Sequence, residues 1–114
     1  MLLAFSFIVL ALLFSSCAQP PYVQLMNESI RLHSQFRLVE AIVTAEKALT
    51  SAEETLGPEH PDVAIALNNL AEFHKGAGFF SKDEATRQKA AAIAGPMHKR
   101  ALAIREKTLG LKRC

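Results

Sequence analysis

The residue types that usually carry out chemistry are few in this chain and lie far apart in the sequence. No histidine stands near a cysteine, a carboxylate or another histidine in an arrangement typical of a metal site. The four histidines are His33, His60, His74 and His98. No nucleophile motif surrounds the serines or cysteines. The adjacent Glu53 and Glu54 are typical of a solvated helix surface, not of a pair of catalytic carboxylates. We therefore expect no enzymatic activity, no metal site and no cofactor.

Cys17 is the residue whose neighbours favour a covalent modification. Residues 2–14 are apolar except for Ser6, a run too short to cross a bilayer but typical of an export signal. The tract Phe14-Ser15-Ser16-Cys17 resembles a bacterial lipobox, in which small residues fit the signal peptidase and the cysteine thiol receives a lipid. Two features depart from that pattern: phenylalanine stands in place of the usual leucine, and no basic residue precedes Arg31.

The lipobox resemblance leads to a prediction about location. Residues 1–17 are predicted to be a signal peptide, and residues 18–21 a stiff, proline-containing linker. The mature protein is then exported to the periplasm or cell envelope and anchored to the membrane through a lipid on Cys17. Cleavage after Ala18 would instead give a secreted protein. Cys114 is then either a free thiol or a link between two copies of the chain.

Composition and charge indicate one small helical domain. Half of the 114 residues are hydrophobic, and alanine and leucine dominate, which favours helix over strand. The 13 basic and 11 acidic residues give a formal net charge of +2, too balanced for a nucleic-acid-binding protein. The basic residues between Lys99 and Arg113 are typical of a solvated helix face.

From Tyr22 onward the sequence has the periodicity of an α-helix. Apolar and small side chains recur every three or four residues, which predicts one buried face. They are Tyr22, Leu25, Ser29, Leu32 and Phe36. A second amphipathic helix is predicted from Leu38 to Leu56. Gly57 is expected to end it in the left-handed conformation, and Pro58 prevents its continuation.

The C-terminal half is also predicted to be helical. Pro61 begins the next helix, and Lys75-Gly76-Ala77-Gly78 is expected to end it. Ser81 is expected to cap the helix that follows. Gly95-Pro96 is predicted to interrupt that helix, which resumes over residues 97–109. No strand pattern follows the apolar N-terminal segment, so the predicted fold is all-α, built from antiparallel helical hairpins.

The two halves of the chain repeat each other. Lys47-Ala48-Leu49 corresponds to Arg100-Ala101-Leu102, and Thr55-Leu56-Gly57 corresponds to Thr108-Leu109-Gly110. Self-similarity on this scale is typical of helical repeat proteins, in which neighbouring units bury one another's apolar faces. The sequence therefore predicts a stack of similar helical hairpins.

The second unit is longer than the first. Phe36 and Gly57 are 21 residues apart and Gly78 and Gly110 are 32 apart, so 11 residues are inserted, around Lys82 to Gly95. Eleven residues make about three helical turns, so the insertion can lengthen a helix without rotating its apolar face. Gly95-Pro96 favours a kink or a break instead.

Two strings identify a family resemblance. Leu56–Ala64, which reads LGPEHPDVA, and Leu67–Ala71, which reads LNNLA, resemble the tetratricopeptide repeat of the kinesin-light-chain type, found in many bacterial proteins. Arg100–Lys107 is similar to the second helix of such a repeat. The resemblance covers residues 22–110 and implies an α-solenoid of about two repeats, with residues 111–114 as a tail.

The chain departs from the family pattern in ways that bear on assembly. Phe36 replaces the usual turn glycine, and His74 stands where a tyrosine is typical. About two repeats are fewer than the three or so that a stable stack usually needs. The resemblance therefore implies either that the chain pairs with a partner or a second copy, or that it is a truncated array.

The family resemblance also implies a binding surface. Such repeats bind extended peptides in a concave groove lined by the first helix of each hairpin. The residues that match the groove positions are Asn68, Asn69, Glu72 and Lys75, with Asn27 in the first repeat. Asparagine amides suit this role because they both donate and accept hydrogen bonds and can clamp a peptide backbone.

Three functional hypotheses follow from the sequence. The first is a scaffold that binds a peptide or protein partner through the groove. The second is a structural fragment that associates with copies of itself into a larger solenoid. The third is an accessory subunit of an enzyme or a larger assembly. None of them involves nucleic acid, and the fold by itself does not identify the partner.

Overall fold

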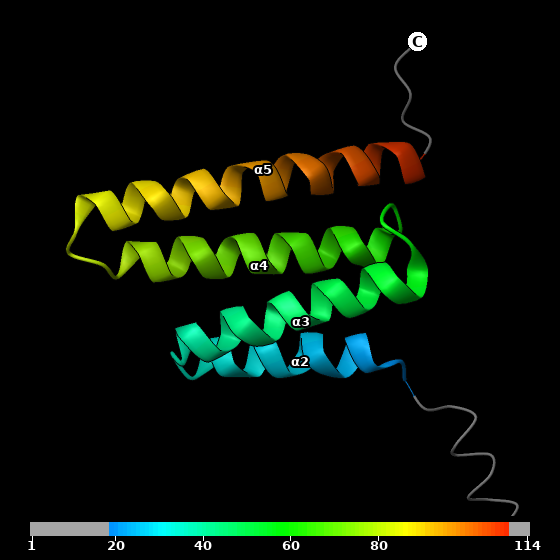
Figure 1. Ribbon diagram of the computed structural model, residues 1–114, viewed down its shortest axis with the longest axis horizontal. Coiled ribbons are helices and arrows are strands. Elements are labelled where there is room, and N and C mark those ends of the chain that lie inside the picture. Colours follow the sequence, from blue (N-terminus) through cyan, green and yellow to red (C-terminus); the bar gives the residue numbers. More distant parts are fainter. Residues whose placement is uncertain (1–18, 110–114) are drawn as a thin grey trace, which may run out of the picture.

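The computed structural model describes residues 19–109, and within them every regular element is an α-helix. The helices are α2 (Pro21–Ser34), α3 (Leu38–Leu56), α4 (Pro61–Phe79) and α5 (Glu84–Thr108). Figure 1 shows two antiparallel hairpins side by side, α2 with α3 and α4 with α5. The prediction of an all-α fold of helical hairpins is confirmed for the described residues. The signal helix predicted at residues 1–17 lies outside them.

The first hairpin follows the sequence prediction except at its turn. The bounds of α3 agree with the predicted Leu38–Leu56. Phe36 was expected on the buried face of the preceding helix, and this is wrong. That helix, α2, ends at Ser34, and Phe36 adopts a φ of 61°, which leaves its side chain 75% exposed. It occupies the left-handed region that the usual turn glycine would enter freely.

Gly57, His60 and Pro61 determine how the chain passes from α3 to α4. Gly57 has the expected positive φ of 88°, but its ψ of 160° is extended instead of left-handed helical. Pro61 occupies the first turn of α4, as predicted. His60 caps that helix, because its Nδ1 accepts a hydrogen bond from the backbone N–H of Asp62 at 3.1 Å.

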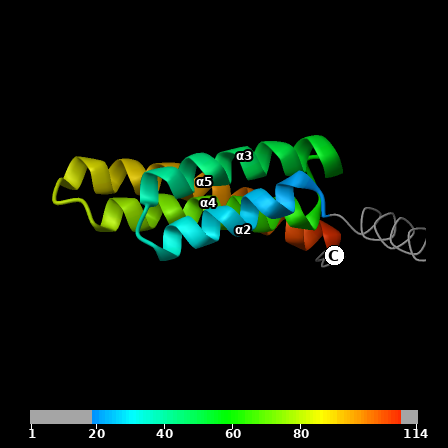
Figure 2. The same ribbon diagram turned by 90° about the horizontal axis from the view of Figure 1, so that it is seen from below.

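The core depends on the small residues of α3. Four alanines, spaced three or four residues apart, are almost completely buried and let the neighbouring helices approach closely. They are Ala41, Ala45, Ala48 and Ala52. Leu32, Leu67 and Leu70 pack around them from α2 and α4. Leu49 and Met97 contact both apolar clusters of the core, so it runs continuously along the hairpins, whose packing is seen from a second side in Figure 2.

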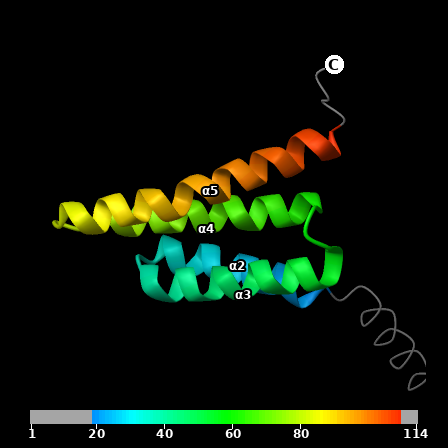
Figure 3. The same ribbon diagram turned by 45° about the horizontal axis from the view of Figure 1, so that its top comes forward.

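Both helices of the second hairpin are longer than their counterparts in the first. Helix α4 has 19 residues against 14 in α2, and α5 has 25 against 19 in α3. Both hairpin turns lie at the same end of the molecule, and the second hairpin extends past the first there (Figures 1 and 3). The insertion was expected around residues 82–95, and most of that range lies in α5, the longer counterpart of α3.

The predicted break at Gly95-Pro96 is wrong, because α5 is one continuous helix with Pro96 inside it. The buried residues of α5 lie on both sides of the proline, and their spacing keeps them on one helical face against α4. They are Ala90, Ala94, Ala101 and Ile104. Because this face is buried on both sides of Pro96, packing against α4 outweighs the tendency of Gly95-Pro96 to interrupt the helix.

The predicted end of α4 is also wrong. The helix passes through Gly76 and Gly78 and reaches Phe79. Gly78 is buried against α5, where an added Cβ would lie 2.5 Å from the Cβ of Ala90. Here glycine permits close helix packing and does not stop the helix.

The cap of α5 is Asp83, not Ser81 as the sequence suggested. The Asp83 carboxylate accepts hydrogen bonds from the Thr86 hydroxyl at 2.8 Å and from the Ala85 N–H at 3.2 Å. These bonds favour the charged form and hold the pKa of Asp83 below its usual range. Ser81 supports the cap, since its hydroxyl accepts from the Asp83 N–H at 3.2 Å.

Candidate protein-binding surface

Three of the predicted groove residues share one exposed face of α4. Asn68, Glu72 and Lys75 follow one another at intervals of three or four residues, which places them on the same side of the helix. The Lys75 ammonium donates to Glu72 Oε1 at 3.2 Å. The Asn68 side chain is half-buried and the other two are exposed. This helix face offers hydrogen-bonding groups and both signs of charge.

Helix α5 adds two residues that the sequence analysis did not assign to this surface. His98 Nδ1 lies 3.0 Å from the side-chain amide of Asn68, and His98 Nε2 lies 3.1 Å from Glu72 Oε1. With its NH2 group turned toward His98, the Asn68 amide donates to Nδ1 and its oxygen accepts from the Arg105 guanidinium at 2.9 and 3.2 Å. We call these five residues the α4–α5 ridge: Asn68, Glu72, Lys75, His98 and Arg105.

His98 is half-buried within the ridge. Its Nε2 is covered, and its contact with Glu72 is within ion-pair distance but outside hydrogen-bonding geometry. Because Nδ1 accepts from the Asn68 amide, the neutral ring carries its proton on Nε2, which faces the Glu72 carboxylate. His98 thus links Asn68 and Glu72 across the two helices.

Asn69 and Asn27 are not part of the ridge. Asn69 is half-buried on the neighbouring side of α4, and Asn27 is exposed on α2. Neither makes a side-chain hydrogen bond to a ridge residue within residues 19–109. The structure therefore brings together three of the five residues that the resemblance implied and leaves the other two apart.

A partly buried contact joins the first helices of the two hairpins. The Tyr22 hydroxyl of α2 donates to Asp62 Oδ2 of α4 at 2.8 Å. This hydrogen bond, together with burial and the negative charge of Asp62, raises the pKa of Tyr22 above its usual value of 10.0. About three turns further along α2, His33 stacks on Phe73 of α4 with ring centroids 4.5 Å apart. No sequence motif signals either contact, because the partners come from different repeats.

Charged residues also connect α5 to α3 and to the loop between the hairpins. Arg100 pairs with Glu53 at 3.1 Å, and Lys107 pairs with Glu59 at 2.5 Å. Arg100 also donates to the Pro58 carbonyl at 3.3 Å. A shallow depression beside these pairs is lined by Pro58, Glu59, Arg100, Ala103, Ile104 and Lys107. The charged groups of this depression are thus engaged in pairs between α5 and the segments beside it.

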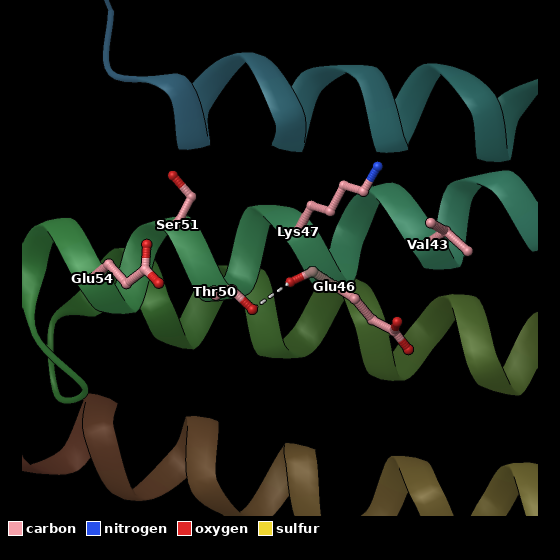
Figure 4. A pocket seen from close by; sticks show the side chains of 6 residues that line it. All are labelled: Val43, Glu46, Lys47, Thr50, Ser51 and Glu54. Atoms are coloured by element: carbon pink, nitrogen blue, oxygen red, sulfur yellow. Dashed lines mark hydrogen bonds between the residues drawn. The ribbon is translucent and has the colours of Figure 1, made fainter.

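A second depression lies on the outer face of α3 (Figure 4). All its lining residues come from that one helix: Val43, Glu46, Lys47, Thr50, Ser51 and Glu54. The Thr50 hydroxyl donates to the backbone carbonyl of Glu46 at 3.1 Å. Since no second element contributes to it, this depression is an open, solvated helix face.

A metal site would require at least three histidine, cysteine, aspartate or glutamate side chains close together. Residues 19–109 contain no such group. The ridge itself contains one histidine and one carboxylate, fewer ligands than a zinc site needs. The arrangement of the ridge is that of a hydrogen-bonding surface.

The match to known families falls on the first hairpin. Residues 25–62 match the tetratricopeptide repeat family model. The matched segment contains most of α2, all of α3 and the loop into α4, and it supports a tetratricopeptide repeat protein. Tetratricopeptide repeats generally mediate interactions between proteins and are typically non-enzymatic scaffolds. A comparison with curated proteins gives no match.

Proposed function

We propose that this tetratricopeptide repeat chain is a scaffold that binds a peptide segment of a partner protein along the α4–α5 ridge. The observation that carries the proposal is the convergence of Asn68, Glu72 and Lys75 with His98 on one exposed surface. The likeness of LGPEHPDVA and LNNLA to repeats of the kinesin-light-chain type supports the same function, because groove residues of that family include the asparagines.

The ridge suits an extended peptide because its groups are already oriented. The Asn68 amide can exchange its bond to His98 for one to a peptide N–H or carbonyl. Glu72 and Lys75, which pair with each other at 3.2 Å, can each pair with an opposite charge on the partner. Exposed ion pairs are weak, so giving up the internal pair costs little. Asn69 and Asn27 remain proposed contacts for a longer partner.

The experiment places a photo-crosslinking amino acid at position 75, on the ridge, and in a separate protein at position 47, on the outer face of α3. We expect the ridge position to capture a discrete partner and position 47 not to capture it. The double variant Asn68→Ala and Glu72→Ala should remove the capture, while the control Lys47→Ala should leave it unchanged. Equal capture from both faces, or capture that survives the double variant, would show that the ridge is not the binding surface.

A second candidate function is self-association or assembly into a larger solenoid. Leu102 and Leu109 correspond in the repeat to Leu49 and Leu56, which pack into the core of the first unit. In the second unit both leucines are exposed, by 58% and 69%. An exposed pair at packing positions is typical of an edge that another unit or an accessory subunit covers.

Sedimentation velocity over a range of concentrations tests this second candidate. We expect the chain to associate and Leu102→Ser to reduce the association. A monomer at every concentration would exclude self-association, and the ridge would then be the remaining candidate surface.

We also propose that the protein is exported and lipid-anchored. The support is the apolar run at residues 2–14 and the lipobox-like tract that ends in Cys17, both outside the described residues. Within residues 19–109, no helix is long and apolar enough to cross a membrane. Mass spectrometry of the mature protein tests the proposal: an acylated N-terminal Cys17 is expected, cleavage after Ala18 would indicate secretion, and a retained Met1 would exclude export.

A further inference from the structure

Three phenylalanines form an exposed cluster where the two hairpins turn. Phe36 comes from the turn of the first hairpin, and Phe79 and Phe80 come from the end of α4. The rings of Phe36 and Phe80 meet edge to face with centroids 6.2 Å apart, and those of Phe79 and Phe80 meet at 5.5 Å. Their exposed fractions are 75%, 78% and 62%. We call this cluster the aromatic tip.

The fold does not need the ring of Phe36. Its backbone has a φ of 61°, a conformation that strains a residue with a Cβ and that glycine adopts freely. The side chain that causes this strain is three-quarters exposed, so its burial does not compensate for the strain. A bulky apolar residue at a strained and exposed position indicates a contact outside the chain.

The area of the aromatic tip is too small for a stable dimer. An aromatic side chain presents about 150–250 Å² of surface, so the three exposed fractions amount to roughly 300–550 Å². A stable protein interface needs about 800 Å² from each partner. The tip lies at the end of the molecule where both hairpins turn (Figure 1).

The charges around the tip favour a surface without net charge. Five basic and five acidic side chains lie within eight residues of the phenylalanines along the chain: Arg31, Arg37, Lys75, Lys82, Arg87, Glu28, Glu40, Glu72, Asp83 and Glu84. Four ion pairs within the chain engage eight of them, namely Arg31 with Glu28, Arg37 with Glu40, Lys75 with Glu72 and Arg87 with Glu84. Binding to an anionic membrane would require an excess of basic residues, which is lacking here.

We propose that the aromatic tip inserts into the headgroup region of a zwitterionic lipid bilayer. Lipid adapts to a protruding apolar surface and needs no complementary pocket, and phenylalanine side chains bury readily at the boundary of the acyl chains. The exposed side chain of Lys82, beside the tip, is long enough to reach lipid phosphates while its methylene groups remain near the rings. The inserted surface includes none of the five ridge residues.

The experiment uses tryptophan as a local reporter, because the full chain contains none. Phe79→Trp places the reporter in the tip, and Val43→Trp in the matched control places it on the exposed face of α3. Each full-length protein is mixed with phosphatidylcholine vesicles, with and without brominated acyl chains. We expect a blue shift of the emission and quenching by bromine for position 79 and neither change for position 43. Vesicle binding through another segment would not quench position 79.

A second variant tests the role of the strained residue. Phe36→Gly in the Phe79→Trp background should preserve the helical circular dichroism, because glycine suits a φ of 61°, but should reduce the bromine quenching at least several-fold. The proposal is overturned if position 79 is not quenched, or if quenching is unchanged by Phe36→Gly. It is equally overturned if the blue shift requires anionic lipid, or if it develops with protein concentration in the absence of vesicles.

Discussion

Pro96 should destabilise the native protein, and its replacement by alanine should stabilise it. The residue lies near the middle of the 25-residue α5. It has no N–H to donate to the carbonyl of Ala92, and its ring crowds that carbonyl. A proline in a helix interior is about 3 kcal/mol less favourable than alanine. Pro96 is exposed, so Pro96→Ala removes little packing.

The expected gain in the free energy of unfolding is about 2–3 kcal/mol, slightly less than the full helix preference. Gly95 lacks a Cβ, so it relieves part of the clash that proline imposes on the residue before it. For a domain of this size the gain corresponds to a rise in Tm of about 10–20 °C. That is a large share of the roughly 5–15 kcal/mol that stabilises a typical domain.

Urea unfolding followed by circular dichroism at 222 nm measures the effect of Pro96→Ala. Lys99→Ala is the matched control, since it changes an exposed position of the same helix and should alter stability by less than about 0.5 kcal/mol. A change for Pro96→Ala no larger than that of the control would refute the reasoning. Such a result would mean that the helix is interrupted at the proline, as the sequence alone suggested.

Two further predictions concern packing and proton binding. Gly78→Ala should lower the free energy of unfolding by about 1–3 kcal/mol relative to Gly76→Ala. A Cβ at position 78 would lie 2.5 Å from the Cβ of Ala90, whereas a Cβ at position 76 would lie 3.4 Å from its nearest neighbour, His33 Nε2. Equal stabilities in urea would contradict this. Tyr22, the single tyrosine of the chain, should ionise above pH 10.0, and Asp62→Asn should lower its titration midpoint, measured by ultraviolet absorbance. Because folding raises the pKa of Tyr22, the hydrogen bond stabilises the protein fully below pH 10.0 and less as the pH rises through the pKa of the folded state. A titration midpoint of Tyr22 that Asp62→Asn leaves unchanged would contradict this prediction.

Local sequence patterns predicted most of the helices because their apolar faces repeat with the helical period. Leu38–Leu56 was predicted with the observed bounds, and Pro61 marks the start of α4 as expected. The same reasoning was wrong where a local signal competes with packing. Gly95-Pro96 and Gly78 are helix-breaking signals in the sequence, but they lie inside helices whose buried faces pack along each other.

The candidate surface was predicted only in part. The resemblance to the tetratricopeptide repeat identified Asn68, Glu72 and Lys75, which are close together in sequence and lie on one helix face. His98 and Arg105 are 30 and 37 residues from Asn68 along the chain and reach it only because α5 packs antiparallel to α4. Contacts of this kind have no local pattern, since they depend on the register between two helices.

By itself, the sequence determined that this chain forms amphipathic helices arranged as two similar hairpins. That information is contained in the spacing of apolar residues, which is local. The tertiary structure alone decided which side chains meet and which remain exposed. Phe36 shows the reason: its spacing from Leu32 suggests a buried helical residue, but the chain leaves the helix before it and turns at a positive φ, which carries the ring outward to Phe80.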